Sequence, residues 1–301
     1  MRKLEGVIPV LLTPLDASGK VDKASLSLLV KHLIQKNIGG LWVLGTGSED
    51  MNLTFEQRLQ VAETVCGANN GKVPLILGAG FFAMADSLAF IKATEHLDFD
   101  AYHLMPYHPL LSLDRIEWLY KTVADAAPRP LWMYTSANWC RYIPPEFIEK
   151  IKGYPNIAGI KFSTSNAVHS EKAISLADDN FQVITAVVRT FYANLCMGVA
   201  ATTTVEACPF ADAIIDIYEK FKNGALQSSF NAQKKLNRFL EKMPPEPGRD
   251  NFLKVAEGKY ILSRSGLCQA YMSGYYRGLT DQEKDRIDAL IEDHPWLNAG
   301  K

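Results

Sequence analysis

Lys161 and Tyr134 are the two side chains whose types and positions suggest covalent catalysis. Lys161 ends a short apolar run that starts at Ala158, and a polar stretch follows from Ser163. Burial at the end of a strand disfavours the ammonium form of a lysine, and a neutral amine attacks a carbonyl carbon to form a Schiff base. Tyr134 ends the preceding apolar run, so its phenol is expected beside the amine as a proton carrier. The alternatives are a lysine that reaches solvent and a core tyrosine with a satisfied hydroxyl.

A second candidate feature is the turn Gly45–Glu49, which contains Thr46, Gly47 and Ser48. Its small residues expose main-chain N–H groups and two hydroxyls, and such a turn holds a carboxylate as a backbone nest holds an anion. The alternative is an ordinary loop in which a hydroxyl caps local structure. We expect Glu49 to be a structural acceptor in the turn rather than a catalytic base.

The elements that must position these residues follow from an alternation of short apolar runs with amphipathic stretches, which predicts parallel strands with helical crossovers. The predicted strands are Val7–Leu12, Gly40–Leu44, Pro74–Gly78, Ala101–Leu104, Pro130–Tyr134, Ala158–Lys161, Gln182–Thr185 and Gly198–Thr202. The predicted helices are Lys23–Lys36, Thr54–Ala68, Met84–Leu97, Asp114–Ala126, Pro145–Lys152, Glu171–Ala177, Thr190–Met197 and Pro209–Lys222.

Eight such units in residues 1–224 indicate an α/β fold, a (β/α)8 TIM barrel, whose active site forms where the strands end. A doubly wound sheet is the competing layout, but the first strand runs into Thr13-Pro14 and not into a glycine-rich phosphate turn. Residues 225–301 are helical in pattern and predict a C-terminal helical extension packed on the barrel. Its predicted helices are Leu226–Lys242, Asn251–Ser263 and Thr280–Ile291.

Composition narrows the class of protein. The chain has 301 residues, of which 48% are hydrophobic, and its formal net charge is −1, so a basic nucleic-acid-binding face is not expected. The five cysteines are scattered and form no metal-ligand pattern with the histidines, which argues against a disulfide framework and a metal site. No signal-peptide or membrane-span pattern is present, so we expect a cytoplasmic protein that does not bind membranes.

Several of these motifs together resemble the dihydrodipicolinate synthase/N-acetylneuraminate lyase family of pyruvate-dependent class I aldolases. The resemblance covers Gly6 to about Ile291 and rests on the order and spacing of Val10-Leu11-Leu12-Thr13-Pro14, Gly45-Thr46-x-x-Glu49, Pro106-Tyr107, Tyr134 and Gly159-Ile160-Lys161. It implies a barrel with a helical extension, usually a homotetramer. It also implies Lys161 as the Schiff-base lysine with no other cofactor, Tyr134 as the proton shuttle and the Gly45–Ser48 turn as the seat of the 2-oxo acid carboxylate.

The chain departs from this family pattern at several positions. Gly47 stands where the family turn usually has a second hydroxyl, and the two alternatives are that Ser48 supplies a shifted replacement or that main-chain amides alone hold the carboxylate. His108 stands where the synthases have a second tyrosine, which argues against a lysine-pathway synthase and makes His108 a candidate acid or base. The synthases' substrate-binding arginine falls near Trp139, with Arg141 close by. In addition, Ala186 replaces a glycine, and Phe81-Phe82 replaces smaller polar residues.

The preferred hypothesis is a lyase that cleaves or forms a carbon–carbon bond of a 2-oxo acid and releases pyruvate and an aldehyde. Its catalytic residues would be Lys161 and Tyr134, and its substrate-binding residues Thr46, Gly47, Ser48, Tyr107 and His108. One alternative is a dehydratase of a 3-deoxy-2-oxo sugar acid that uses the same imine. Another is a barrel that binds a 2-oxo acid without turnover, which the altered turn motivates and the retained lysine and tyrosine oppose.

Overall fold

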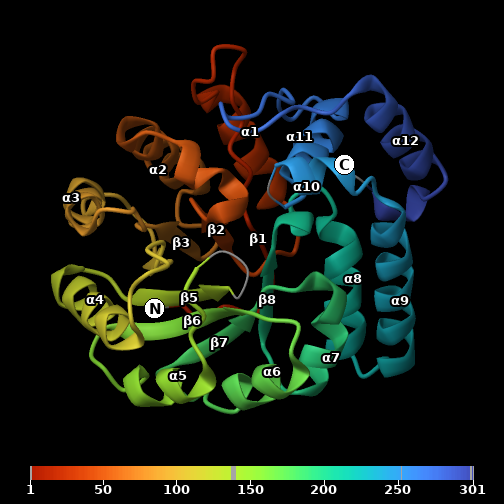
Figure 1. Cartoon of the computed structure of the whole chain (residues 1–301). Helices are drawn as coiled ribbons and strands as arrows, with labels where there is room; N and C mark the ends of the chain where they lie inside the picture. The colour runs from red at the N-terminus through yellow and green to blue at the C-terminus, as the bar shows by residue number, and fades with distance from the viewer. Residues whose placement is uncertain (1, 137–139, 252, 299, 301) are drawn as a thin grey trace.

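The strands form a parallel barrel. The computed structural model describes residues 2–136, 140–251, 253–298 and 300. Within these residues there are eight strands: β1 Gly6–Pro9, β2 Leu41–Val43, β3 Leu75–Gly78, β4 Ala101–Leu104, β5 Leu131–Ser136, β6 Ile157–Ser163, β7 Gln182–Thr185 and β8 Ala201–Thr204. They pair in the order β1-β8-β7-β6-β5-β4-β3-β2, and a bridge between Val10 and Trp42 joins the two ends. The predicted (β/α)8 barrel is confirmed (Figure 1).

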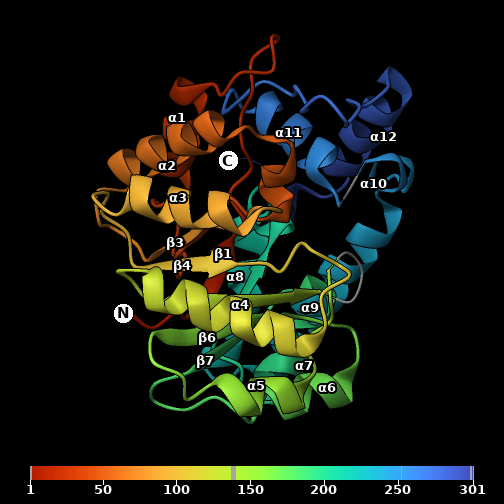
Figure 2. The same cartoon turned by 60° about the vertical axis from the view of Figure 1, so that its left-hand side comes forward.

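Helices follow the strands and cover the outside of the barrel. The barrel helices in the described residues are α1 Lys23–Leu33, α2 Phe55–Asn69, α3 Met84–Thr94, α4 Leu113–Ala126, α5 Pro145–Ile151, α6 Ala167–Ile174, α7 Phe191–Cys196 and α8 Ala211–Lys222. Figure 2 shows α2, α3 and α4 one below another, with β3 and β4 visible between α3 and α4. Short 3-10 turns follow three of the strands: η1 Thr46–Ser48 and η2 Asp50–Asn52 follow β2, η3 Val188–Thr190 follows β7, and η4 Val205–Ala207 follows β8. These turns carry much of the site described below.

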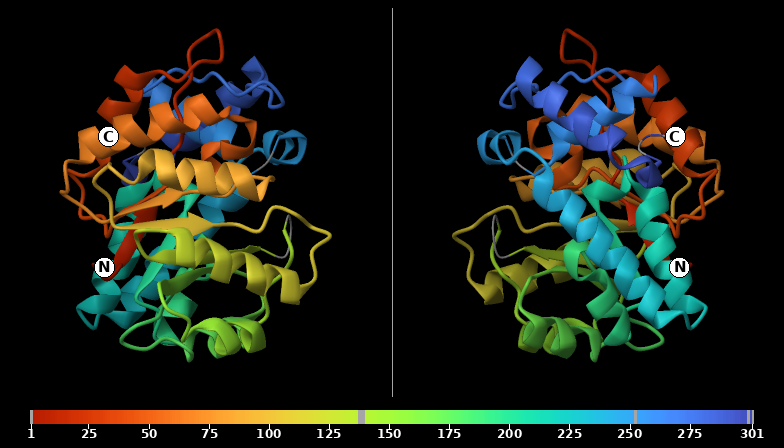
Figure 3. Two further views of the ribbon diagram at one scale, coloured as in Figure 1. Left: turned by 90° about the vertical axis from the view of Figure 1, so that its left-hand side faces the viewer. Right: turned by 90° about the vertical axis from the view of Figure 1, so that its right-hand side faces the viewer.

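The rest of the chain is a helical extension on one side of the barrel. It comprises α9 Leu226–Lys242, α10 Glu246–Asp250, α11 Val255–Arg264, α12 Asp281–Glu292 and η5 Pro295–Leu297. Helix α9 packs along α8. The later part of the extension, drawn in blue, lies beside α8 and α1 (Figures 1 and 3). The rings of Phe210 and Phe239, 5.2 Å apart at their centroids, join the two parts through an edge contact. A division of the chain between residues 224 and 225 remains our proposal.

Some predicted element boundaries were wrong for local reasons. Helix α6 begins at Ala167 and not at Glu171, because the Asn166 side chain accepts hydrogen bonds from two main-chain N–H groups of the first turn. The proline-rich segment after α9 forms the short helix α10, since proline is tolerated in the first turn of a helix. Helix α11 therefore starts at Val255, whereas the predicted helix started at Asn251 and included residue 252, which lies outside the described residues. None of the described helices has the length and apolar character that crossing a bilayer requires.

Candidate active site

The Lys161 amine is buried inside the barrel and lies next to a phenol. Strand β6 holds Lys161 in register with Tyr134 of β5, so both side chains point to the same face. The Nζ atom lies 4.3 Å from the centroid of the Tyr134 ring and 5.2 Å from that of Trp42. Lys161 is 4% exposed, and burial lowers the pKa of its amine from 10.5 to about 7, against an opposing effect of the Asp50 and Glu206 carboxylates.

A cavity of about 210 Å³ opens above this amine at the ends of the strands. Strands and turns from both halves of the barrel contribute to its wall, and the extension adds Leu253. The lining residues are Val10, Gly47, Tyr134, Lys161, Ser163, Ala186, Val187, Val188, Arg189, Thr203, Thr204, Val205, Glu206 and Leu253. This position is where TIM barrels place their active sites.

The η1 turn places Gly47 in the cavity wall and Thr46 next to Tyr134, and it turns the Ser48 hydroxyl away from the cavity. The Thr46 hydroxyl lies 3.5 Å from the Tyr134 hydroxyl, so the two oxygens are within reach of one proton. The Ser48 hydroxyl donates to the main-chain oxygen of Leu11 at 2.6 Å and accepts from Gly45 N–H at 3.3 Å. Ser48 therefore stabilises the turn, and its hydroxyl is not aimed at the cavity.

Gly47 is explained by packing at the cavity wall. A Cβ at this position would lie 3.1 Å from a methyl group of Val10 and 3.2 Å from one of Val205. These contacts are tighter than ordinary van der Waals contact, so a hydroxyl-bearing residue at position 47 would require Val10 or Val205 to move. The close packing of Val10 and Val205 around this position thus accounts for a residue without a side chain here.

Glu49 ties the turn to the extension. Its backbone is left-handed, with φ of 60°, and its carboxylate accepts from Ser273 N–H at 2.8 Å and pairs with Lys259 of α11. Both side chains of the pair are fully buried. Glu49 is therefore a structural acceptor, as the sequence predicted, and its partner lies far along the chain.

Tyr107 lies behind the site in a buried polar cluster. Its hydroxyl donates to the Asp50 carboxylate, and Arg58 approaches the same carboxylate at 3.5 Å. Arg58 also donates to the main-chain oxygens of Asp50 and Gly80. Burial and the nearby Asp50 charge raise the pKa of the Tyr107 hydroxyl well above 10. Tyr107 is not among the residues that line the Lys161 cavity.

His108 lies in a separate aromatic hollow. Its ring stacks on Phe82, with the two centroids 4.9 Å apart. The hollow has a volume of about 200 Å³ and is lined by apolar side chains of α3, α4 and their loops, including Phe81 and Trp118. Within one copy of the chain, the structure therefore brings Lys161, Tyr134, Thr46 and Gly47 together and leaves His108 apart from them. Trp139 lies outside the described residues, and Arg141 is exposed.

Comparison with known proteins agrees with this architecture. The model of the dihydrodipicolinate synthetase family matches residues 3–293. The chain belongs to this family. A curated relative from Listeria monocytogenes serotype 4a, a 4-hydroxy-tetrahydrodipicolinate synthase, is 26% identical over 290 residues, which cover 95% of this chain and 97% of that protein.

Solved structures show the same fold. Dihydrodipicolinate synthase from Bacteroides thetaiotaomicron superposes with a TM-score of 0.90 at 21% identity and covers 97% of this chain and 100% of its own. N-acetylneuraminate lyase from Proteus mirabilis superposes with a TM-score of 0.88 at 24% identity, and the match covers 97% of this chain and 99% of that protein. The resemblance inferred from the sequence motifs is confirmed at the level of family and fold.

Four polar side chains near the amine were not predicted: Asp50, Arg189, Thr203 and Glu206. Arg189 and Glu206 follow the ends of β7 and β8, so the rule that barrel sites form at strand ends could have found them. Thr203 is buried within β8, and its hydroxyl has no hydrogen-bond partner among the described residues. Asp50 adjoins the predicted turn, but its contact with Tyr107 depends on the fold.

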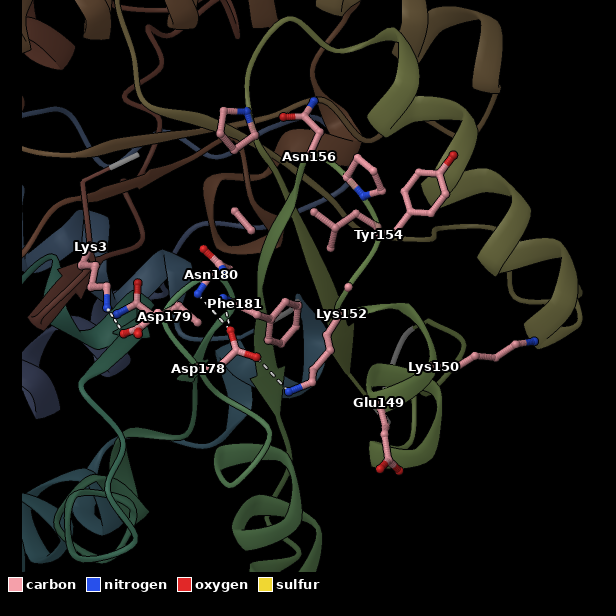
Figure 4. A pocket seen from close by; sticks show the side chains of 16 residues that line it. Lys3, Glu149, Lys150, Lys152, Tyr154, Asn156, Asp178, Asp179, Asn180 and Phe181 are labelled. Atoms are coloured by element: carbon pink, nitrogen blue, oxygen red, sulfur yellow. Dashed lines mark hydrogen bonds and ion pairs between the residues drawn. The ribbon is translucent and has the colours of Figure 1, made fainter.

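Elsewhere the molecule shows no equally good candidate for an active site among the described residues. A larger hollow, of about 740 Å³, lies at the opposite end of the barrel, where the strands begin. Figure 4 shows that charged groups there pair with one another: Lys152 with Asp178 at 2.9 Å, and Lys3 with Asp179 at 3.5 Å. Within the described residues, no three histidine, cysteine or acidic side chains gather as a metal site would require.

Proposed function

We propose that the protein is a class I lyase that acts on a 2-oxo acid through an imine at Lys161. The observation that carries this proposal is a buried amine with a pKa of about 7 that lies 4.3 Å from the centroid of a tyrosine ring. At pH 7 about half of such an amine is neutral and nucleophilic, whereas a lysine with a pKa of 10.5 is neutral in about one molecule in 3,000. The lyase chemistry is that of the pyruvate-dependent class I aldolases, in keeping with the chain's family.

The expected reaction begins when the Lys161 nitrogen bonds to C2 of the substrate and the ketone oxygen leaves as water. Tyr134 supplies the proton with which that water leaves, and the protonated imine then draws electrons from the C3–C4 bond, which breaks as the Tyr134 phenolate takes up the proton of the C4 hydroxyl. An aldehyde departs, a proton adds to C3, and water hydrolyses the imine to release pyruvate. Thr46 is within reach of the phenol and is positioned to relay its proton.

The substrate carboxylate would be held by the main chain of the η1 turn. The N–H groups of Ser48 and Glu49 donate to Gly45 and Thr46 oxygens within the turn. The N–H groups of Thr46 and Gly47 begin the turn and need no partner inside it. These two amides, with the Thr46 hydroxyl, form the proposed carboxylate seat, and Ser48 supports them from behind.

Reductive trapping tests the imine. Incubation with pyruvate and borohydride should add mass irreversibly to the peptide that contains Lys161. Lys259→Met is a useful comparison because Lys259 is equally buried but is paired with Glu49, so loss of that lysine should not remove the label from a folded protein. A folded wild-type protein without label on Lys161 would end the proposal. A labelled protein that turns over no 2-oxo acid would instead favour the binding barrel.

Dehydration of a 3-deoxy-2-oxo sugar acid is the second candidate outcome. The observation in its favour is Glu206, a carboxylate that lines the same cavity and supplies a second proton acceptor besides Tyr134. Elimination requires such a base to remove a proton from C3 before the C4 hydroxyl leaves. Analysis of products distinguishes the two reactions, because the lyase releases pyruvate and the dehydratase keeps the carbon skeleton whole.

We also propose that copies of the chain associate through the aromatic hollow around His108. Phe82 is 69% exposed, Leu110 is 86% exposed and Trp118 is 43% exposed on this face. A gathering of large apolar side chains of this kind is typical of an interface. A homotetramer in the cytoplasm is the expectation for the family, and sedimentation analysis measures the assembly state directly. In such an assembly Tyr107 and His108 would lie next to a neighbouring copy.

A further inference from the structure

The cavity above Lys161 has a second charged wall, formed by Arg189. This residue belongs to η3, directly after β7, and lines the same cavity as Lys161 and Tyr134. Arginine is always charged near neutral pH and presents several N–H donors in a planar fork. A cation in this wall is placed to meet a part of the substrate that extends beyond the reacting carbons.

The main chain that carries Arg189 is fixed from behind by α9. Asn237 Nδ2 donates to the main-chain oxygen of Arg189 at 2.9 Å, and Gln233 Nε2 donates to that of Val188 at 3.1 Å. The Thr190 hydroxyl closes the turn by donating to the Val187 oxygen at 3.0 Å. The position of η3 therefore does not depend on the Arg189 side chain, and that side chain can be changed without loss of the turn.

The ion pair that Arg189 makes within the chain is weak. Its Nη1 atom lies 3.3 Å from Glu241 Oε1, and the two side chains are 39% and 65% exposed. A single-contact pair at this exposure contributes little, because solvent screens it. A carboxylate or phosphate inside the cavity would instead meet the fork through two parallel hydrogen bonds, which are stronger.

The acidic groups near the cavity act on its reacting end. Asp50 and Glu206 both raise the pKa of Lys161, so their charges favour the ammonium form and the cationic imine that replaces it. Glu206 also accepts a hydrogen bond from the Thr204 hydroxyl. Among the described residues, Arg189 forms its salt bridge with Glu241 and with neither of these carboxylates, so a ligand anion has to replace only that exposed pair.

Thr203 gives an independent sign that a polar ligand occupies this cavity. Lys161 pairs with Ile184, and Thr185 pairs with Thr202, so Thr203 lies on the same inner face as Lys161. Its hydroxyl is buried, lines the cavity and has no hydrogen-bond partner among the described residues. Buried hydroxyls are normally paired, so this one is suited to a hydroxyl of the substrate.

We propose that Arg189 binds an anionic group at the far end of the substrate. The substrate is then a 2-oxo acid with a second anion, a carboxylate or a phosphate, and with a hydroxyl between them that meets Thr203. This inference rests on the proposed imine function and adds the class of its second product, an anionic aldehyde.

The test measures condensation of pyruvate with matched pairs of aldehydes. Glyoxylate is compared with glycolaldehyde, and glyceraldehyde 3-phosphate with glyceraldehyde, so the two pairs distinguish a carboxylate from a phosphate. Wild-type kcat/KM should favour the anionic member of at least one pair by about tenfold or more, since a hydrogen bond to a charged group contributes about 1.5–3 kcal/mol. Arg189→Gln should remove this preference: kcat/KM for the anionic aldehyde should fall by about tenfold or more relative to that for its neutral counterpart, so that the ratio of the two approaches one.

Glu241→Gln is the matched control. It breaks the same ion pair from the other side but keeps the guanidinium, so it should keep the preference for the anion. A wild-type enzyme that prefers neutral aldehydes would overturn the inference, as would equal losses in the two variants. Borohydride trapping of pyruvate at Lys161 is measured in parallel: if wild type labels normally but shows no anion preference, only the inference about Arg189 fails, whereas absence of label rejects the imine function itself.

Discussion

Replacement of Lys161 by methionine should stabilise the fold, by an amount that depends on pH. Burial lowers the pKa of the amine from 10.5 to about 7, and each unit of pKa corresponds to about 1.4 kcal/mol. Holding this lysine inside the barrel therefore costs about 5 kcal/mol below pH 7, where both the folded and unfolded states are protonated. Methionine has a similar length and no charge to desolvate.

The sign of the pH dependence follows from proton uptake. Between pH 7 and 10.5 the unfolded lysine binds more protons than the folded one, so the stability of the wild type rises with pH. The advantage of Lys161→Met should thus be about 4 kcal/mol at pH 7 and about 2 kcal/mol at pH 9. Denaturant unfolding of both proteins at these two pH values measures the difference.

Lys259→Met is the matched control, since it removes the other fully buried lysine of the site region. It leaves the Glu49 carboxylate buried without its cation, which should lower the free energy of unfolding by about 3–5 kcal/mol. The two substitutions are therefore expected to change the free energy of unfolding in opposite directions. A Lys161→Met variant that is destabilised, or whose gain is the same at pH 7 and pH 9, would refute a depressed pKa at Lys161.

Three further results are expected. Asp50→Asn should move the midpoint of pyruvate trapping to lower pH, because the Asp50 charge raises the pKa of Lys161; a shift to higher pH contradicts this. Thr46→Val should lower kcat by about tenfold or more through loss of the proton relay, whereas Ser48→Ala should keep kcat and lose about 1 kcal/mol of stability. Steady-state kinetics measure kcat, and denaturant unfolding measures the stability. An equal fall in kcat in the two variants would mean that both hydroxyls serve catalysis. Phe82→Asp should reduce association in sedimentation experiments, because a buried charge opposes an apolar interface, and an unchanged assembly would place the interface elsewhere.

The sequence predicts the barrel well because its evidence is periodic. Each strand is a short apolar run bounded by turn residues, so eight runs define both the elements and their order. The pairing of Tyr134 with Lys161 follows from the same periodicity, since equal positions on neighbouring parallel strands share a face. Element ends are less certain, because a cap such as Asn166 contributes only a local hydrogen bond.

The details of the site depend on contacts that no local pattern contains. Ser48 is a plausible carboxylate ligand by type, but its hydroxyl turns to the Leu11 oxygen because the first barrel loop passes beside it. Arg189 and Glu206 are ordinary charged residues until the barrel brings their strand ends around Lys161. Sequence reasoning can identify the nucleophile from its surroundings along the chain, whereas specificity arises from residues that only the closed barrel makes neighbours.

The pairing of Glu49 with Lys259 has a consequence for how such enzymes can be rebuilt. A turn beside the reaction centre takes its support from a helix more than two hundred positions later in the chain. A shortened version that ends after the eighth barrel helix would keep every strand, yet it would leave an acid stranded in the interior. Exchange of this tail for that of a relative therefore works only if the incoming segment brings a cation to the same spot.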